Sequence, residues 1–187
     1  MEMKNNVTST YTAISASLYI LPFILVGSFL SIFDQFVINV AAPAIISSLH
    51  PSAAEFEGIM SGYALVYGAG LMVGGHLGDR FGRRRIYRLG LFLFAVTSVL
   101  CGAAQTALQL VVARLLQGLS GAVMVPQVLA LIRVSYEDNA RVQALSAFGV
   151  SIGLGQIMGQ VFGGWIPAWD FLGLGWRMIF LANVPIC

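Results

Sequence analysis

Charged residues are scarce in this 187-residue chain. Only 10% of its residues are Asp, Glu, Lys or Arg, whereas 58% are hydrophobic. About a quarter of the residues of a soluble globular domain are charged, so the composition excludes an ordinary soluble protein. The few charges are clustered and leave apolar stretches of about 20 residues, the length that spans a bilayer as a helix. The sequence therefore predicts an all-α, multi-pass integral membrane protein.

Residues that serve in catalysis or metal binding are also few. The two cysteines, Cys101 and Cys187, cannot form a disulfide framework, and the two histidines, His50 and His76, are isolated from each other. The sequence contains no Ser/His/Asp or Cys/His constellation, no phosphate-binding loop and no run with metal-ligand spacing. We therefore expect no enzymatic activity, no metal, no cofactor and no nucleic-acid partner.

A basic stretch, GHLGDRFGRRR at residues 75–85, separates two uncharged apolar runs. Together with Arg88 it holds five of the ten Lys and Arg residues. A stretch this charged cannot lie in hydrocarbon, so it must lie at a membrane surface. By the positive-inside rule this surface is cytoplasmic, which predicts a cytoplasmic N-terminus. We expect the membrane to be a plasma membrane, the inner membrane of a bacterium.

The alternation of apolar runs and polar loops predicts one domain over residues 1–187. It contains five complete membrane spans and the start of a sixth, with Pro22 favouring a helix start. Residues 136–143 form a second cytoplasmic loop, and residues 49–57 and 167–175 form outer loops. The spans are residues 22–47, 58–77, 89–104, 108–131, 144–166 and, incompletely, 177–187.

The basic stretch resembles the loop between the second and third helices of the major facilitator superfamily. The resemblance implies a helical bundle of that type and a hinge loop that helps to hold the outward-open state. The residue types allow close helix packing, a tight turn and an ion pair; a generic basic loop that only sets topology is the alternative. The matching residues are Gly75, Gly78, Asp79, Arg80, Gly82, Arg83, Arg84 and Arg85.

Asp34 lies about twelve residues into the predicted first span, or about 18 Å, near the middle of the membrane. Burial favours the protonated form of a carboxyl group and a nearby cation favours the ionised form, so such a group can take up and release a proton. A permanently satisfied carboxylate is the alternative. The surrounding FDQFVINVAAP resembles the first-helix signature L-D-x-T-V-V-N-V-A-L-P of fourteen-span proton-coupled drug antiporters, with departures at Phe33, Phe36 and Ala42.

Arg114 lies about six residues into the predicted fourth span. The run RLLQGLSG from residue 114 resembles the fourth-helix motif R-x-x-Q-G-x-G of the same antiporters, which implies a role for Arg114 in proton coupling. The predicted depths of Asp34 and Arg114 differ by about one to two helical turns, which leaves a direct pair open. A static ion pair or an arginine that reaches the membrane surface is the alternative.

Glycines recur along the predicted fifth span. Gly155, Gly159 and Gly163 are four residues apart and therefore share one helix face, which lets another helix approach closely. With Gly164 they resemble the antiporter motif G-x-x-x-G-P-x-x-G-G, although Gln160 stands at the proline position. Ordinary glycine packing is the alternative. Residues 176–186, WRMIFLANVPI, resemble the start of the sixth helix.

Together these resemblances imply the N-terminal half of a major facilitator transporter. The implied function is proton-coupled efflux of lipophilic or cationic drugs, with protons, a small-molecule substrate, the lipid bilayer and a missing C-terminal half as partners. A proton-coupled uptake symporter and a non-transporting membrane fragment are the alternatives. Whether the sequence is a piece of a longer transporter or a fragment that exists by itself, we expect the hinge loop and the glycine face to lack their usual partners.

Overall fold

The structure, a computed structural model, describes residues 2–169 and 174–187, where helices are joined by short non-helical segments and no strand occurs. Five long helices, each with a stretch that could cross a membrane by length and composition, precede a short one. An all-α bundle with five complete spans and the start of a sixth is therefore confirmed. The helices are α1 (Glu2–Leu49), α2 (Ala53–Phe81), α3 (Arg83–Ala103), α4 (Ala107–Ser135), α5 (Asp138–Trp169) and α6 (Met178–Leu181), with 3-10 turns at Gly175–Arg177 and Val184–Ile186.

Local signals set several helix ends. Ser52 and Glu55 form a reciprocal capping box that starts α2, and Thr106 accepts a hydrogen bond from the Gln109 N–H at the start of α4. Gly82, with φ of 93°, separates α2 from α3 in a backbone conformation that favours glycine. The predicted outer loop at residues 167–175 lies partly outside the described residues, and Asp170 lies entirely outside them.

The basic stretch is more helical than predicted. Residues 75–81 belong to α2 and residues 83–88 to α3, so Gly82 is the single non-helical residue of the expected loop. A helix satisfies its own backbone hydrogen bonds, so it can continue beyond the apolar span until a residue such as glycine ends it. Pro22 lies inside α1 and does not start it, because membrane helices tolerate proline.

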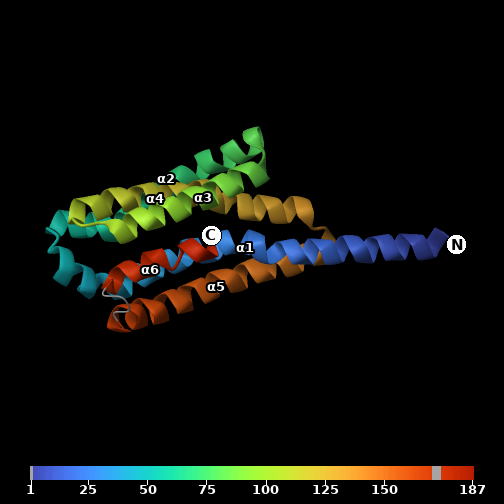
Figure 1. Cartoon of the computed structure of the whole chain (residues 1–187). Coiled ribbons are helices and arrows are strands. Elements are labelled where there is room, and N and C mark those ends of the chain that lie inside the picture. Colours follow the sequence, from blue (N-terminus) through green and yellow to red (C-terminus); the bar gives the residue numbers. More distant parts are fainter. Residues whose placement is uncertain (1, 170–173) are drawn as a thin grey trace.

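The helices form two groups. α1 packs along α5, and α4 packs against both α2 and α3. Figure 1 shows the α2–α4 group above the α1–α5 pair, with α6 beside α1. The groups meet where α1 contacts α4, and α6 contacts α1, α3 and α5. This arrangement brings residues of α1, α4 and α6 together in the interior.

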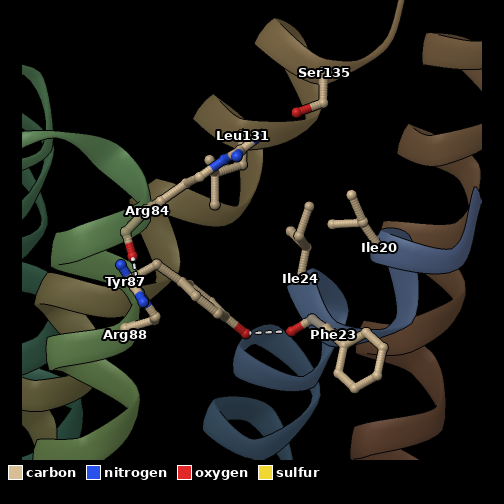
Figure 2. A pocket seen from close by; sticks show the side chains of 8 residues that line it. All are labelled: Ile20, Phe23, Ile24, Arg84, Tyr87, Arg88, Leu131 and Ser135. Carbon is tan, nitrogen blue, oxygen red and sulfur yellow. Dashed lines mark hydrogen bonds between the residues drawn. The ribbon is translucent and has the colours of Figure 1, made fainter. Parts of the chain in front are cut away.

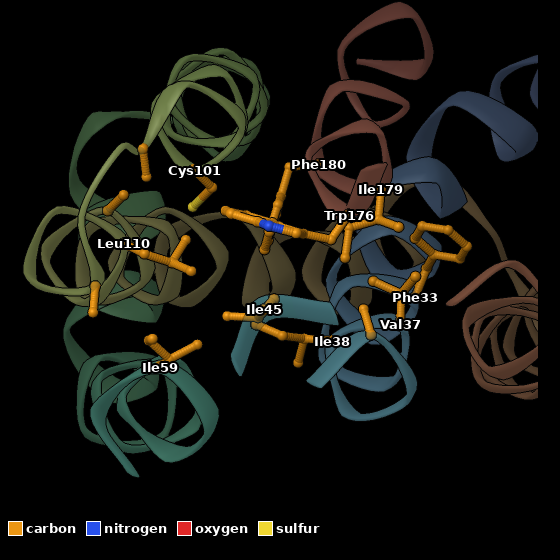
Figure 3. Close-up of a cluster of buried hydrophobic side chains, with 14 residues drawn as sticks. Phe33, Val37, Ile38, Ile45, Ile59, Cys101, Leu110, Trp176, Ile179 and Phe180 are labelled. Atoms are coloured by element: carbon orange, nitrogen blue, oxygen red, sulfur yellow. The ribbon is translucent and has the colours of Figure 1, made fainter. Parts of the chain in front are cut away.

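The apolar interior is divided into two clusters. One contains Phe33, Val37, Ile38, Ile59, Leu110, Trp176 and Phe180, and the rings of Trp176 and Phe180 lie between the two helix groups (Figure 3). The other contains Ile24, Leu30, Tyr63, Phe94, Met124 and Val128. Along α1, α3 and α4, the polar residues Asp34, Ser98, Arg114 and Gln117 fall at the boundary between these clusters. These four polar residues therefore form a layer between the two apolar clusters, which we call the polar layer.

Candidate functional site

Asp34 of α1 and Arg114 of α4 form an ion pair inside the bundle. Arg114 Nη1 donates to Asp34 Oδ2, and both side chains are about fully buried. The sequence predicted similar depths in the membrane for these two residues, and the structure places them in direct contact. A buried ion pair is costly to dehydrate, so it needs further hydrogen bonds to be stable.

Two amide side chains complete the surroundings of the carboxylate. Gln117 Nε2 and Asn183 Nδ2 each donate to Asp34 Oδ1 at 3.1 Å. Gln117 also accepts from Arg114 Nη1 at 2.8 Å, so it contacts both members of the pair. Arg114 Nε donates to the Ile59 carbonyl oxygen at 3.4 Å. The charges are thus held by α1, α2, α4 and the C-terminal segment at once.

Aromatic rings cover the guanidinium group. Arg114 Cζ lies 4.6 Å from the centre of the Tyr63 ring and 5.8 Å from that of Phe180. Such contacts stabilise a cation, more so where water is excluded. The Tyr63 hydroxyl is hydrogen-bonded to the Ser31 hydroxyl at 2.7 Å, which fixes the ring against α1. Arg114 therefore keeps favourable contacts that do not involve Asp34.

The polar layer extends beyond the ion pair. Gln117 Nε2 donates to Ser98 Oγ at 2.9 Å, and Cys101 Sγ donates to Gln117 Oε1 at 3.3 Å. Among the described residues, Asn183 Oδ1 and Trp176 Nε1 are buried without a hydrogen-bond partner. Both atoms belong to the C-terminal segment, where Asn183 borders the polar layer and Trp176 lies in the adjacent apolar cluster.

The glycine face of α5 has a partner within this chain. A Cβ atom on Gly155, Gly159 or Gly163 would lie 2.9, 2.7 or 2.6 Å from the carbonyl oxygen of Phe29, Phe33 or Val37, respectively. These are main-chain atoms of α1, so α1 and α5 approach as closely as glycine permits. The expectation that this face lacks its partner is wrong, because consecutive turns of α1 occupy it. Gly164 contributes less, since its Cβ would meet the Val40 side chain at 3.5 Å.

The basic stretch lies far along the bundle from Asp34. Asp79 pairs with Arg83 at 3.0 Å, and Arg83 also donates to the Ala130 carbonyl oxygen of α4 at 3.1 Å. Close packing at Gly78 fits the prediction, because a Cβ there would clash with the Gln127 side chain. The prediction of close packing at Gly75 is wrong, since a Cβ there would meet nothing within 4 Å.

The close contact predicted for Gly75 belongs to Gly74. A Cβ on Gly74 would clash with the Ala122 backbone, and Gln127 Nε2 donates to the Gly74 carbonyl oxygen at 2.7 Å. Gly74 and Gly78 are four residues apart, so they lie on the same face of α2, and α4 packs on that face. Arg80 lies with its guanidinium carbon 5.5 Å from the Phe81 ring centre.

Sequence reasoning did not place Gln117, Asn183 or Tyr63 around the ion pair. Gln117 and Asn183 are amides within apolar runs, where an unpaired amide is costly, and this was the signal that could have marked them. Tyr63 gave no such signal, since aromatic residues are common in membrane helices. Its position over Arg114 depends on how α2 packs against α4.

Residues 24–187 match the sequence profile of the Major Facilitator Superfamily. The chain belongs to the Major Facilitator Superfamily. This confirms the family predicted from the basic stretch and from the motifs around Asp34 and Arg114. Within the superfamily, a probable actinorhodin transporter of Streptomyces coelicolor is 41% identical over 163 residues. A tetracenomycin C resistance and export protein of Streptomyces glaucescens is 35% identical over 161 residues.

These matches cover most of this chain but a small part of the relatives. They include 87% and 86% of this chain and 28% and 29% of the two relatives. Among solved structures, a bacterial homologue of the human lysosomal transporter Spinster, in an inward-facing, unoccupied conformation, superimposes with a TM-score of 0.77. It is 24% identical, and the match covers 91% of this chain and 41% of that one. The similarity supports the superfamily fold.

Proposed function

We propose that this chain forms the first helical domain of a secondary transporter that exports lipophilic or cationic small molecules in exchange for protons. The names of two relatives, an actinorhodin transporter and a tetracenomycin C resistance and export protein, support export of a small molecule. The observation that carries the proton-coupling part is the Asp34–Arg114 ion pair, buried between α1 and α4. A second helical domain is its proposed partner, since such transporters bind substrate between two rocking domains.

The proposed proton site is the Asp34 carboxylate. A proton bound there removes the negative charge that holds Arg114, and its release restores the ion pair. Arg114 stays protonated throughout, so it tunes the site without carrying the proton. When Asp34 is neutral, the guanidinium retains Gln117 Oε1, the Ile59 carbonyl oxygen and the Tyr63 ring. The pair thus has two arrangements that proton binding can shift.

The proposed energy source is the proton gradient. One charge moved through 100 mV yields about 2.3 kcal/mol, which adds to the chemical gradient of the proton. Binding of a cationic substrate near the layer would favour loss of the Asp34 proton. Proton release and substrate uptake would then be linked through one carboxylate.

We also propose that the basic stretch lies on the cytoplasmic side, in a bacterial inner membrane, and biases the transporter towards its outward-open state. The proposal rests on the clustering of arginines at one end of α2 and α3. The test is labelling of a cysteine at Gly82 with a membrane-impermeant thiol reagent, in a background without Cys101 and Cys187. We expect labelling only after permeabilisation. Labelling in intact cells would reverse the orientation and place the N-terminus outside.

The decisive test of proton coupling is Asp34→Asn in the complete transporter. We expect substrate-induced proton release from everted vesicles, measured with ethidium as a cationic probe, to be abolished. Asp34→Glu should keep part of the activity because it retains a titratable carboxyl group. Glu57→Gln is the matched control, since it removes one exposed carboxylate outside the polar layer. Undiminished proton exchange in Asp34→Asn would reject Asp34 as the coupling residue.

A further inference from the structure

Tyr63 of α2 is completely buried where α1, α2 and α4 meet, although its side chain ends in a polar hydroxyl. The hydroxyl is hydrogen-bonded to Ser31 Oγ at 2.7 Å, and Ser31 lies on α1 three residues before Asp34. The centre of the Tyr63 ring lies 4.6 Å from Cζ of Arg114 on α4. Tyr63 therefore contacts both of the helices that carry the ion pair.

Two glycines of α4 leave the space that Tyr63 occupies. A Cβ atom on Gly118 would lie 2.5 Å from the Tyr63 carbonyl oxygen, and one on Gly121 would lie 2.8 Å from the Tyr63 hydroxyl oxygen. Both distances are too short for a real Cβ atom. These glycines belong to the same RLLQGLSG run as Arg114. The helix that supplies the cation therefore also provides the room for the ring that covers it.

The contacts of Arg114 depend on the charge of Asp34 to different degrees. Gln117 is hydrogen-bonded to both members of the pair, so its position depends on the carboxylate. Among the described residues, Tyr63 and Phe180 are the rings over Arg114, and Tyr63 is the nearer one. An aromatic ring stabilises a cation most where water is excluded. The ring contributes most when a proton neutralises Asp34, because the guanidinium then loses its counter-charge.

We propose that Tyr63 is a positioning residue of the proton cycle. Its ring holds Arg114 in place while Asp34 carries a proton, and its hydrogen bond to Ser31 holds the ring against α1. This inference rests on the proposed proton site at Asp34 and adds a residue that acts on that site through Arg114. Without the ring, the guanidinium would depend more on the negative charge of Asp34, so a proton would bind there less tightly.

The other titratable groups around Asp34 leave this expectation unchanged. Among the described residues they are Arg114 of α4, Tyr63 of α2, Cys101 of α3 and Cys187 at the C-terminal end, while α5 presents its glycine face to this part of α1. Thiol and phenol groups ordinarily lose their protons at about pH 8.5 and above. A change in the pH profile below that range therefore reports on the carboxyl group.

Tyr87 of α3 provides a matched control for Tyr63. It is also buried, and its hydroxyl donates to the Phe23 carbonyl oxygen of α1 at 2.6 Å (Figure 2). The same hydroxyl accepts from the Gly27 N–H at 3.2 Å, about two helical turns from the ion pair. The rings that cover the guanidinium group in the described chain do not include that of Tyr87. Tyr87→Leu therefore removes a buried phenol that holds α1 and leaves the guanidinium contacts in place.

The test is substrate-induced proton release by the complete transporter, purified in detergent and measured over a range of pH with ethidium as the cationic probe. Release requires a proton on Asp34, so it declines as the pH rises. We expect Tyr63→Leu to move the midpoint of this decline to lower pH by about one unit, a tenfold change in proton binding. Tyr63→Phe should shift the midpoint less, because it keeps the ring, and Tyr87→Leu should leave it unchanged.

An unchanged midpoint in an active Tyr63→Leu transporter would overturn the proposal. Equal shifts in Tyr63→Leu and Tyr87→Leu would overturn it as well, because they would indicate a general loosening of α1. If Tyr63→Leu is inactive, thermal unfolding of the same variants decides. The loss of stability caused by Tyr63→Leu should be larger in an Asp34→Asn background than with Asp34 present, and equal losses would show that the ring does not replace the counter-charge. This comparison does not depend on transport, whereas proton release retained by Asp34→Asn would reject the proposed function itself.

Discussion

Two Arg–Asp ion pairs occur among the side chains that the structure describes, and they lie in opposite environments. Asp34–Arg114 joins residues 80 positions apart on α1 and α4 and is completely buried. Asp79–Arg83 joins residues four positions apart across Gly82, and its side chains are 66% and 35% exposed. Water can replace either partner of the second pair but not of the first. Loss of one charge should therefore be severe in the interior and mild at the basic stretch.

The largest effect should follow from Arg114→Ala. This change leaves the Asp34 carboxylate buried without its counter-charge, which we expect to lower the free energy of unfolding by about 3–5 kcal/mol. Thermal unfolding of the chain in detergent measures the loss. The double variant Asp34→Asn/Arg114→Ala should be more stable than Arg114→Ala alone, because it removes the unpaired charge. Simple additivity of the two single changes would mean that the pair does not contribute as a unit.

A smaller effect should follow from Gly159→Ala. The new Cβ would lie 2.7 Å from the Phe33 carbonyl oxygen, so α5 must move away from α1 beside Asp34. We expect a loss of about 1–3 kcal/mol in the same unfolding measurement. Gly153→Ala is the matched control on α5, because a Cβ there meets nothing within 4 Å. Equal losses in both variants would attribute the effect to helix propensity and not to packing against α1.

Asn183→Ala should lower the free energy of unfolding by less than Arg114→Ala or Gly159→Ala. It removes one donor to Asp34 Oδ1, while Gln117 and Arg114 still contact the carboxylate. It also removes the buried Asn183 Oδ1 that has no partner, which offsets part of the loss. We expect about 1 kcal/mol less stability. A loss as large as that of Arg114→Ala would show that the C-terminal segment is essential to hold the pair.

The smallest effect on stability should follow from Asp79→Asn. We expect a change of about 1 kcal/mol or less, reduced further at high salt, because the pair is exposed and screened. Efflux by the complete transporter should nevertheless fall if the basic stretch biases its conformations as proposed. Unfolding and efflux measured on the same variant separate these effects. A stability loss comparable to that of Arg114→Ala would abolish the distinction between the two pairs.

The sequence was informative where a cost in the membrane marks a residue. Asp34 and Arg114 stand out because charges are rare in apolar runs, and their similar depths follow from helical rise alone. Helix ends were less predictable. α2 begins five residues before the predicted span and ends four residues after it. A capping box sets its start and Gly82 sets its end, whereas the prediction followed hydrophobicity.

Contacts between segments that are distant in the chain could not be predicted from the sequence. Asn183 reaches Asp34 across 149 positions, and the choice of Gly74 over Gly75 depends on which face of α2 meets α4. The glycine face of α5 was recognised from its spacing, but its partner was not. Spacing identifies a face of a helix, whereas tertiary packing decides what lies against it.

The polar layer between the two apolar clusters also constrains how the helices can move. A slide of α1 along α4 by one turn, about 5.4 Å, would carry Asp34 into an apolar cluster and separate it from Arg114, Gln117 and Asn183. A change of tilt about the layer would keep these contacts while the ends of the helices separate or close. The contacts of the polar layer therefore restrict α1 more against sliding than against tilting, and a tilt would be centred near the carboxylate proposed to bind the proton.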